Sequence, residues 1–231
     1  MGYTVLQNFA EKISVFVNTL FLHILDRFYL AKYKFFNKPP YPYSEEIVMV
    51  DPERVKYSIP NYRIPNGYRR HGILKGDWDK DKRKLENTSW KGLRQRFVEG
   101  RNWEDTDYYE NGVKRITEGT NLPIKRADGA KSVEEFQKHL KNIEELYSSI
   151  QGEGYRDEST IKVIIGRDGN WIVLYGYHRL MISKTLDIEQ VPLEIRFRHR
   201  KWQNKREKVY STPELKNTMK KPDHPDLEVS N

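Results

Sequence analysis

A short segment between residues 163 and 182 carries the residue types best suited to binding an anion. Gly176, His178 and Arg179 fall where a run of β-branched and aromatic residues gives way to a helical pattern. At such a junction the first N–H groups of the helix have no intrahelical partner, and the helix dipole favours negative charge. An arginine adds a guanidinium that can bind two phosphate oxygens. Gly176, Tyr177, His178 and Arg179 are therefore predicted to bind phosphate.

Two flanking runs predict the hairpin that positions this segment. Residues 162–165 and 171–175 are rich in β-branched and aromatic types, and residues 167–170 between them read Arg-Asp-Gly-Asn, a turn signal. Arg167 and Asp168 are expected to be turn residues at the hairpin tip. A short helix is expected from Leu180, followed by a strand that opens at Val191.

Each residue of the segment also has a structural interpretation. Gly176 can simply allow a tight turn between strand and helix. His178 can be a packed histidine that bonds a backbone carbonyl, and Arg179 can be a surface or salt-bridged arginine. The clustering of all three at one predicted helix start favours phosphate binding over these separate explanations.

Two carboxylates in a predicted loop are candidates for metal binding. Asp77 and Asp79 flank Trp78, and together with phosphate oxygens they can bind Mg²⁺. Asp77 can also act as a general base. A solvated turn explains the same residues, so both interpretations stay open.

A basic strand suggests a different function. Arg196, Arg198 and Arg200 alternate with apolar or aromatic residues, which predicts a strand with one basic face and one core face. The basic face can bind a nucleic-acid backbone without sequence readout. It can equally protect a solvated sheet edge against aggregation.

Composition bounds the function classes. The 231 residues carry a net charge of +8, which favours an anionic partner such as a nucleotide, a nucleic acid or a lipid headgroup. The chain has no cysteine, so disulfides, thiolate metal ligands and cysteine nucleophiles are excluded. This usage is consistent with the cytoplasm, the compartment we expect.

The N-terminal segment is expected to form a separate element. Residues 5–36 show apolar residues at helical spacing and predict one amphipathic helix. Its longest weakly polar run, residues 13–25, is too short to span a bilayer. The helix can dock onto the core, or it can lie on a membrane or a partner protein.

Four regions follow from these patterns. A proline-rich stretch at residues 37–44 marks the first boundary, and the stretch from Ser132 to Ile150 predicts a helix with a capping box at Ser132 and Glu135. The polar tail from Tyr210 is expected to be loosely ordered. The regions are a helical extension (1–37), a mixed α/β elaboration (44–130), a core (131–208) and a flexible tail (209–231).

The order of strand, Gly176-Tyr177-His178-Arg179, short helix and a strand opening at Val191-Pro192 resembles the ParB/sulfiredoxin superfamily. The segment from Leu146 to Gly154 is similar to the helix and glycine turn before the hairpin in that superfamily. The chain is also similar to archaeal ParB-domain-like proteins. The shared motifs there are Gly76 to Asp79, Trp103 to Thr106, and Arg198 to Trp202.

The resemblance implies an α+β fold with a small mixed sheet, and nucleotide phosphates bound at the Gly-x-His-Arg turn. By the same analogy Glu153 is a candidate acid or base near that site. Sulfiredoxins place a catalytic cysteine where this chain has Tyr177, so sulfinate reduction is excluded. Chromosome-partitioning ParB proteins carry Gly-Glu-Arg-Arg and continue into a DNA-reading domain that this chain lacks after Trp202.

Three functions are consistent with these patterns. The first is a nucleoside triphosphate hydrolase or phosphotransferase that uses Mg²⁺ at Asp77 and Asp79, with Glu153 orienting the attacking group. The second is a nucleic-acid-binding or nuclease module that uses the basic strand. The third is a non-catalytic binding protein that docks through residues 5–36. The first is our hypothesis because the phosphate turn is the best-matched motif.

Overall fold

The computed structural model describes residues 47–60, 72–86, 88–119, 130–155, 160–211 and 224–227. The amphipathic helix predicted for residues 5–36 and the proline-rich boundary at residues 37–44 lie outside these ranges. Strands from the predicted elaboration and from the predicted core belong to one sheet.

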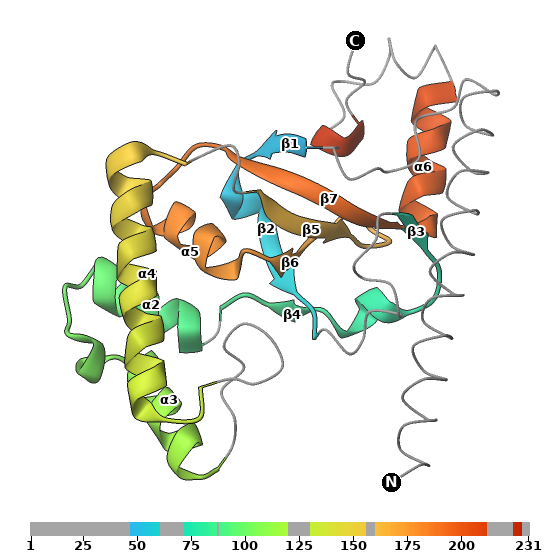
Figure 1. Cartoon of the computed structure of the whole chain (residues 1–231). Helices are drawn as coiled ribbons and strands as arrows, with labels where there is room; N and C mark the ends of the chain where they lie inside the picture. The colour runs from blue at the N-terminus through green and yellow to red at the C-terminus, as the bar shows by residue number, and fades with distance from the viewer. Residues whose placement is uncertain are drawn as a thin grey trace, which may run out of the picture.

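The described part of the chain combines short strands with helices, and α2, α3 and α4 follow one another between the strands β4 and β5 (Figure 1). The strands are β1 (Ile47–Val50), β2 (Val55–Ser58), β3 (Gly72–Leu74), β4 (Arg83–Lys84), β5 (Ile161–Ile165), β6 (Trp171–Tyr175) and β7 (Val191–His199). The α-helices are α2 (Thr88–Phe97), α3 (Asp107–Thr117), α4 (Val133–Glu153), α5 (Tyr177–Thr185) and α6 (Arg200–Ser211). Single 3-10 turns are η1 (Pro52–Arg54), η3 (Trp78–Asp81), η4 (Trp103–Asp105) and η5 (Pro225–Leu227).

The strands form one mixed sheet in the order β1-β7-β5-β6-β2-β4, and β3 also pairs with β7. The predicted hairpin is confirmed, because β5 and β6 pair antiparallel with Ile165 opposite Trp171. Other neighbours, such as β5 with β7 and β2 with β6, run parallel. The predicted α+β class is confirmed at this level.

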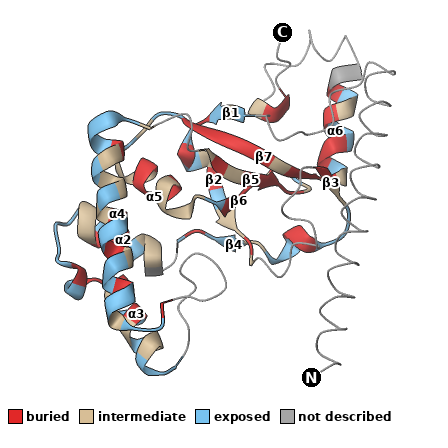
Figure 2. Cartoon of the chain, in the orientation of Figure 1, coloured by how far each residue is buried: buried red, intermediate tan, exposed pale blue. Residues whose placement is uncertain are grey.

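Strand β7 has neighbours along both sides. On one side it pairs with β5. On the other side β1 pairs antiparallel with Val191 to Glu194, and β3 pairs parallel with Phe197 to His199. Eight of its nine residues are buried (Figure 2). A strand paired on both sides and covered on both faces must tolerate burial of its polar residues as well as its apolar ones.

The helices α2, α3, α4 and α5 gather on one side of the sheet, with α5 between α4 and the strands (Figure 1). The larger apolar cluster on this side includes Phe136, Val163 and Leu193. A smaller cluster includes Trp78, Ile164 and Phe197, residues that are likewise brought together from distant segments.

Two glycines let the helices approach closely. A Cβ on Gly92 in α2 would clash with Tyr108 in α3, and a Cβ on Gly112 in α3 would clash with the ring of Phe136 in α4. Phe136 is fully buried, so it has little room to move. Close packing of this kind makes the helix positions sensitive to a single added methyl group.

Helix α4 begins as the sequence predicts. The Ser132 hydroxyl accepts from the Glu135 N–H at 3.2 Å, and the Glu135 carboxylate accepts from the Lys131 N–H at 2.7 Å. Ser132 thus caps the helix as predicted, whereas Glu135 bonds the N–H of the residue before the cap, where a capping box has a bond to the N–H of Ser132 itself.

We expect Gly112→Ala to destabilise the fold by about 1–3 kcal/mol, because the added methyl group meets the buried Phe136 ring. Gly152→Ala is the matched control, since a Cβ on this exposed glycine of α4 meets nothing within 4 Å. Urea denaturation measures both. Equal effects of the two substitutions would show that close packing of α3 on α4 does not stabilise the protein.

Candidate functional site

The predicted phosphate turn forms at the junction of β6 and α5. Gly176 has φ 87° and ψ 25°, a left-handed conformation that glycine adopts without a Cβ penalty. A Cβ at this position would also lie 3.3 Å from the Cα of Ile161 at the start of β5. Glycine is therefore required both by its dihedral angle and by the close approach of the neighbouring strand.

The first turn of α5 has backbone N–H groups that the helix itself does not use. Gly176 is the N-cap and provides no side-chain cap, and the first intrahelical bond runs from the Leu180 N–H to the Gly176 carbonyl at 3.0 Å. The N–H groups of the three residues between them therefore have no partner within the helix. This is the geometry in which a helix binds an anion.

The side chain of Tyr177 anchors the turn. Its ring packs against the larger apolar cluster, and its hydroxyl lies 3.5 Å from the Leu85 carbonyl oxygen. Tyr177 can therefore contribute its backbone N–H to an anion, while its side chain ties α5 to the segment after β4.

The two polar side chains of the turn diverge. The ring of His178 lies 5.1 Å from the ring of His139 on α4. Arg179 is half-buried, and its charge acts on Tyr155, just after α4. Burial raises the pKa of Tyr155 to about 12, an effect that the Arg179 charge opposes. The tyrosine therefore stays protonated at neutral pH beside the guanidinium.

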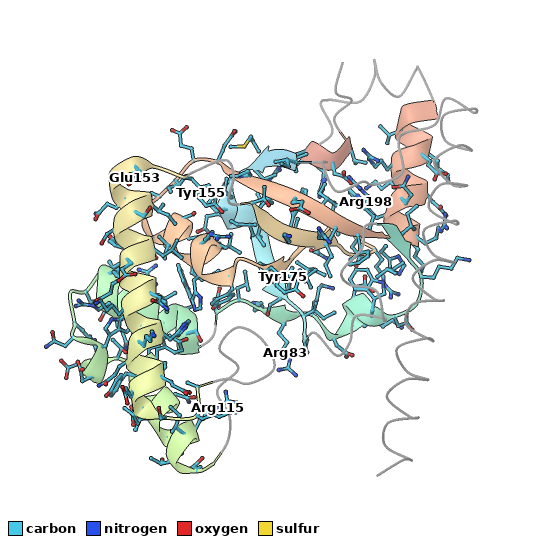
Figure 3. All side chains as sticks on the ribbon, viewed as in Figure 1. Arg83, Arg115, Glu153, Tyr155, Tyr175 and Arg198 are labelled. Carbon is cyan, nitrogen blue, oxygen red and sulfur yellow. The ribbon has the colours of Figure 1, made fainter. Side chains whose placement is uncertain are left out.

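Glu153 is the last residue of α4 and is exposed. Along a helix that rises 1.5 Å per residue, it lies about 21 Å from His139, the α4 residue that contacts His178. Figure 3 shows Glu153 and Tyr155 together at this end of α4. The catalytic candidate is therefore closer to the Tyr155 side of the site than to the His178 side.

Asp77 and Asp79 bind the side chain of Arg167 at the hairpin tip. Asp79 is buried and accepts from the Arg167 Nη2 at 2.6 Å, its Nε at 3.0 Å and its backbone N–H at 2.7 Å. Asp77 accepts from the same Nη2 at 2.8 Å. Burial alone raises the pKa of Asp79, but the Arg167 bonds outweigh it and lower the pKa below 3.8. The sequence predicts only a turn at Arg167, and the structure adds its ion pairs with Asp77 and Asp79.

The aspartates and the phosphate turn lie at opposite ends of β6. Arg167 precedes the strand and Gly176 follows it, so the five residues of β6 separate the two groups by about 16 Å. The structure thus does not bring Asp77 or Asp79 to the predicted phosphate site. Within the described ranges, no group of three or more His, Asp or Glu residues could hold a metal ion.

The prediction that β7 has a solvated basic face is wrong. Arg198 is fully buried and forms an ion pair with Asp226, while the Arg196 Nη1 donates to Glu194 at 2.6 Å. Arg200 is the first residue of α6 rather than part of the strand. Since β7 is paired on both sides, it is not a sheet edge, and the buried Arg198 is not accessible to a nucleic-acid backbone.

The partner of Arg198 comes from the tail, which was expected to be loosely ordered. Asp226 and Leu227 are buried, so this expectation is wrong for these residues. Asp226 also accepts from the Trp202 Nε1 at 2.8 Å, and its carbonyl accepts from the Arg206 Nε at 3.0 Å. Burial raises the pKa of Asp226, but Arg198 and then Arg206 outweigh it and keep the pKa below 3.8.

His224 completes this contact. Its ring stacks on Trp171 at 4.8 Å and packs against Trp202 at 4.6 Å. Its Nε2 lies 2.9 Å from the Gly169 carbonyl, and its Nδ1 accepts from the Asp226 N–H at 3.2 Å. The Nδ1 acceptor role requires a neutral ring, so the proton is on Nε2. No pattern in the polar tail sequence signals these contacts.

Comparison of the chain with protein-family models, curated proteins and solved structures found no match. The ParB/sulfiredoxin resemblance therefore rests on the quoted motifs alone. A search of the helices in the described part of the chain found none that is both long and apolar enough to cross a membrane.

We expect Asp226→Ala to destabilise the protein by about 3–5 kcal/mol, because it leaves the buried Arg198 charge without its carboxylate. The double substitution Arg198→Met with Asp226→Leu should recover part of this loss, since it removes the Arg198 charge but leaves Arg206 and the Trp202 Nε1 without the carboxylate. Urea denaturation at pH 7 measures the effect. A loss below 1 kcal/mol for the single variant would contradict the assigned pairing.

The stability of the fold should also depend on His224. Burial lowers the pKa of His224 below its ordinary 6.5, so the unfolded chain takes up a proton at a higher pH than the folded chain does. This contribution is fully present above pH 6.5 and is lost as the pH falls towards the folded pKa. We expect the rise in urea midpoint between pH 5.5 and 7.5 to be smaller in His224→Gln. An unchanged rise would contradict this assignment.

Proposed function

We propose that this chain binds a phosphate-bearing ligand, a nucleotide foremost, at the start of α5. The observation that carries the proposal is the left-handed Gly176 opening a helix whose next three N–H groups lack intrahelical partners. Arg179 lies within the same turn and can add charge-assisted bonds to phosphate oxygens. The resemblance of this motif to the ParB/sulfiredoxin phosphate turn supports a nucleotide over other anions.

The proposal covers binding and leaves out the Mg²⁺-dependent hydrolysis or phosphotransfer expected from the sequence. Asp77 and Asp79 pair with Arg167 at the far end of β6, and Asp77 also pairs with Lys80, so the two carboxylates have little remaining charge for a cation. Any Mg²⁺ would then come with the phosphate oxygens of the nucleotide, as it often does.

A thermal-shift panel of ATP, CTP and GTP, each with and without Mg²⁺, tests the proposal. A nucleotide at about 100 times its Kd stabilises a protein by about 2.7 kcal/mol, which raises the Tm of a chain of this size by roughly 5–10 °C. We expect such a shift in the wild type and its loss in Arg179→Ala. Arg101→Ala is the control, because Arg101 lies on the surface and pairs with Glu99.

Two outcomes would contradict this proposal. One is the absence of a shift with every nucleotide. The other is an equal shift in the wild type and Arg179→Ala, which would move binding elsewhere. Salt-sensitive retention of DNA or RNA without a nucleotide shift would favour a nucleic-acid partner instead.

A further inference from the structure

A chain of polar side chains leads from the α2–α3 contact to the phosphate turn. Ser89 on α2 hydrogen-bonds the hydroxyl of Tyr108 on α3, and this hydroxyl lies 3.4 Å from the Nε2 of His139 on α4. The ring of His139 in turn packs against His178 on α5. Each of four helices thus contributes one residue.

The protonation state of Tyr108 bears on which group donates in these hydrogen bonds. Burial raises the pKa of Tyr108 to about 12, so its hydroxyl keeps its proton at neutral pH. The bond from Ser89 opposes this rise, as a donor to the phenol oxygen does. The phenol thus has a proton that it can donate to the Nε2 of His139, and with this donor the proton of the His139 ring lies on Nδ1.

The close packing of α2, α3 and α4 at Gly92 and Gly112 also holds this series of polar side chains in place. The Cβ of Tyr108 lies directly over Gly92, and Phe136, one turn before His139, lies against Gly112. Tyr108 and Phe136 also meet edge to face at 5.6 Å. These contacts fix the Tyr108 ring, so its hydroxyl can hold His139 in one orientation.

His178 is bounded by aromatic rings on two sides. His139 packs against it at 5.1 Å with the rings tilted by 59°, and Tyr177 meets it edge to face at 5.7 Å. A fixed neighbour on each side restricts the rotamers of His178. The orientation of its ring nitrogens at the turn therefore depends on that of His139.

We propose that His139 is a positioning residue of the phosphate site, which Tyr108 and Ser89 hold in its Nδ1–H tautomer and which orients His178 towards the bound phosphate. This inference rests on the proposed function. In this proposal the helices α2, α3 and α4 not only cover the sheet but also supply the residues that orient His178.

Imidazole ¹⁵N NMR of the full chain without ligand, together with calorimetric titration of ATP and of inorganic phosphate, tests this proposal. Tyr108→Phe removes only the hydroxyl. We expect it to shift His139 from the Nδ1–H tautomer to a mixture, to move the His178 signals, and to weaken ATP binding about 3- to 10-fold. His139→Phe keeps a flat ring and should weaken binding similarly.

Tyr109→Phe is the matched control. Tyr109 is the next residue of α3, and its ring stacks on the same Phe136. Its hydroxyl oxygen lies 3.5 Å from the Nε2 of Gln137, whereas that of Tyr108 lies near His139. It should leave the histidine signals and the ATP affinity unchanged. A general loss of packing would instead affect Tyr108→Phe and Tyr109→Phe alike, and that result would overturn the proposal.

Unchanged His178 signals in both Tyr108→Phe and His139→Phe would also overturn it. Failure of the wild type to bind inorganic phosphate, ATP, CTP or GTP would refute the proposed function, and with it the role of His139 at a phosphate site. The ligand-free spectra distinguish the two failures. If the wild type binds a nucleotide but the His178 signals do not respond to changes at Tyr108 or His139, only the positioning role of His139 is refuted.

Discussion

The buried ion pair between Arg198 and Asp226 is the constraint on which the centre of the sheet depends. A guanidinium without solvent near the C-terminal end of β7 costs several kcal/mol unless a carboxylate compensates it. That carboxylate comes from η5, far along the chain, and is itself held by Trp202. The strand that pairs with β1, β3 and β5 is therefore electrostatically complete only when the C-terminal residues dock.

Charge is used differently at the two ends of the β5–β6 hairpin. At the tip, Arg167 pairs with Asp77 and Asp79, and His224 bonds the Gly169 carbonyl, so polar groups there satisfy one another. At the other end, the N–H groups after Gly176 lack partners within α5, and Arg179 stands beside them. Structural ion pairs and the candidate site thus occupy separate ends of one hairpin, which allows the scaffold to be rigid without neutralising the site.

The sequence predicts what is local and misses what depends on distant partners. The hairpin, the glycine turn before α5 and the Ser132 cap of α4 follow from residues a few positions apart, and all three are confirmed. The alternation around Arg198 predicted a solvated face, because a pattern along one strand does not reveal how many strands flank it. The contact between Asp79 and Arg167 spans 88 residues, and no local rule pairs them.

The short strands beside β7 have a consequence for self-association. A long open strand edge is a template on which a second chain can pair and aggregate. Here one side of β7 is shared by β1, with four residues, and β3, with three, which run in opposite directions. At the other end of the described sheet lies β4, whose two residues are Arg83 and Lys84. No described outer strand offers a long uncharged ladder, so growth of the sheet from one molecule to the next is interrupted at each border.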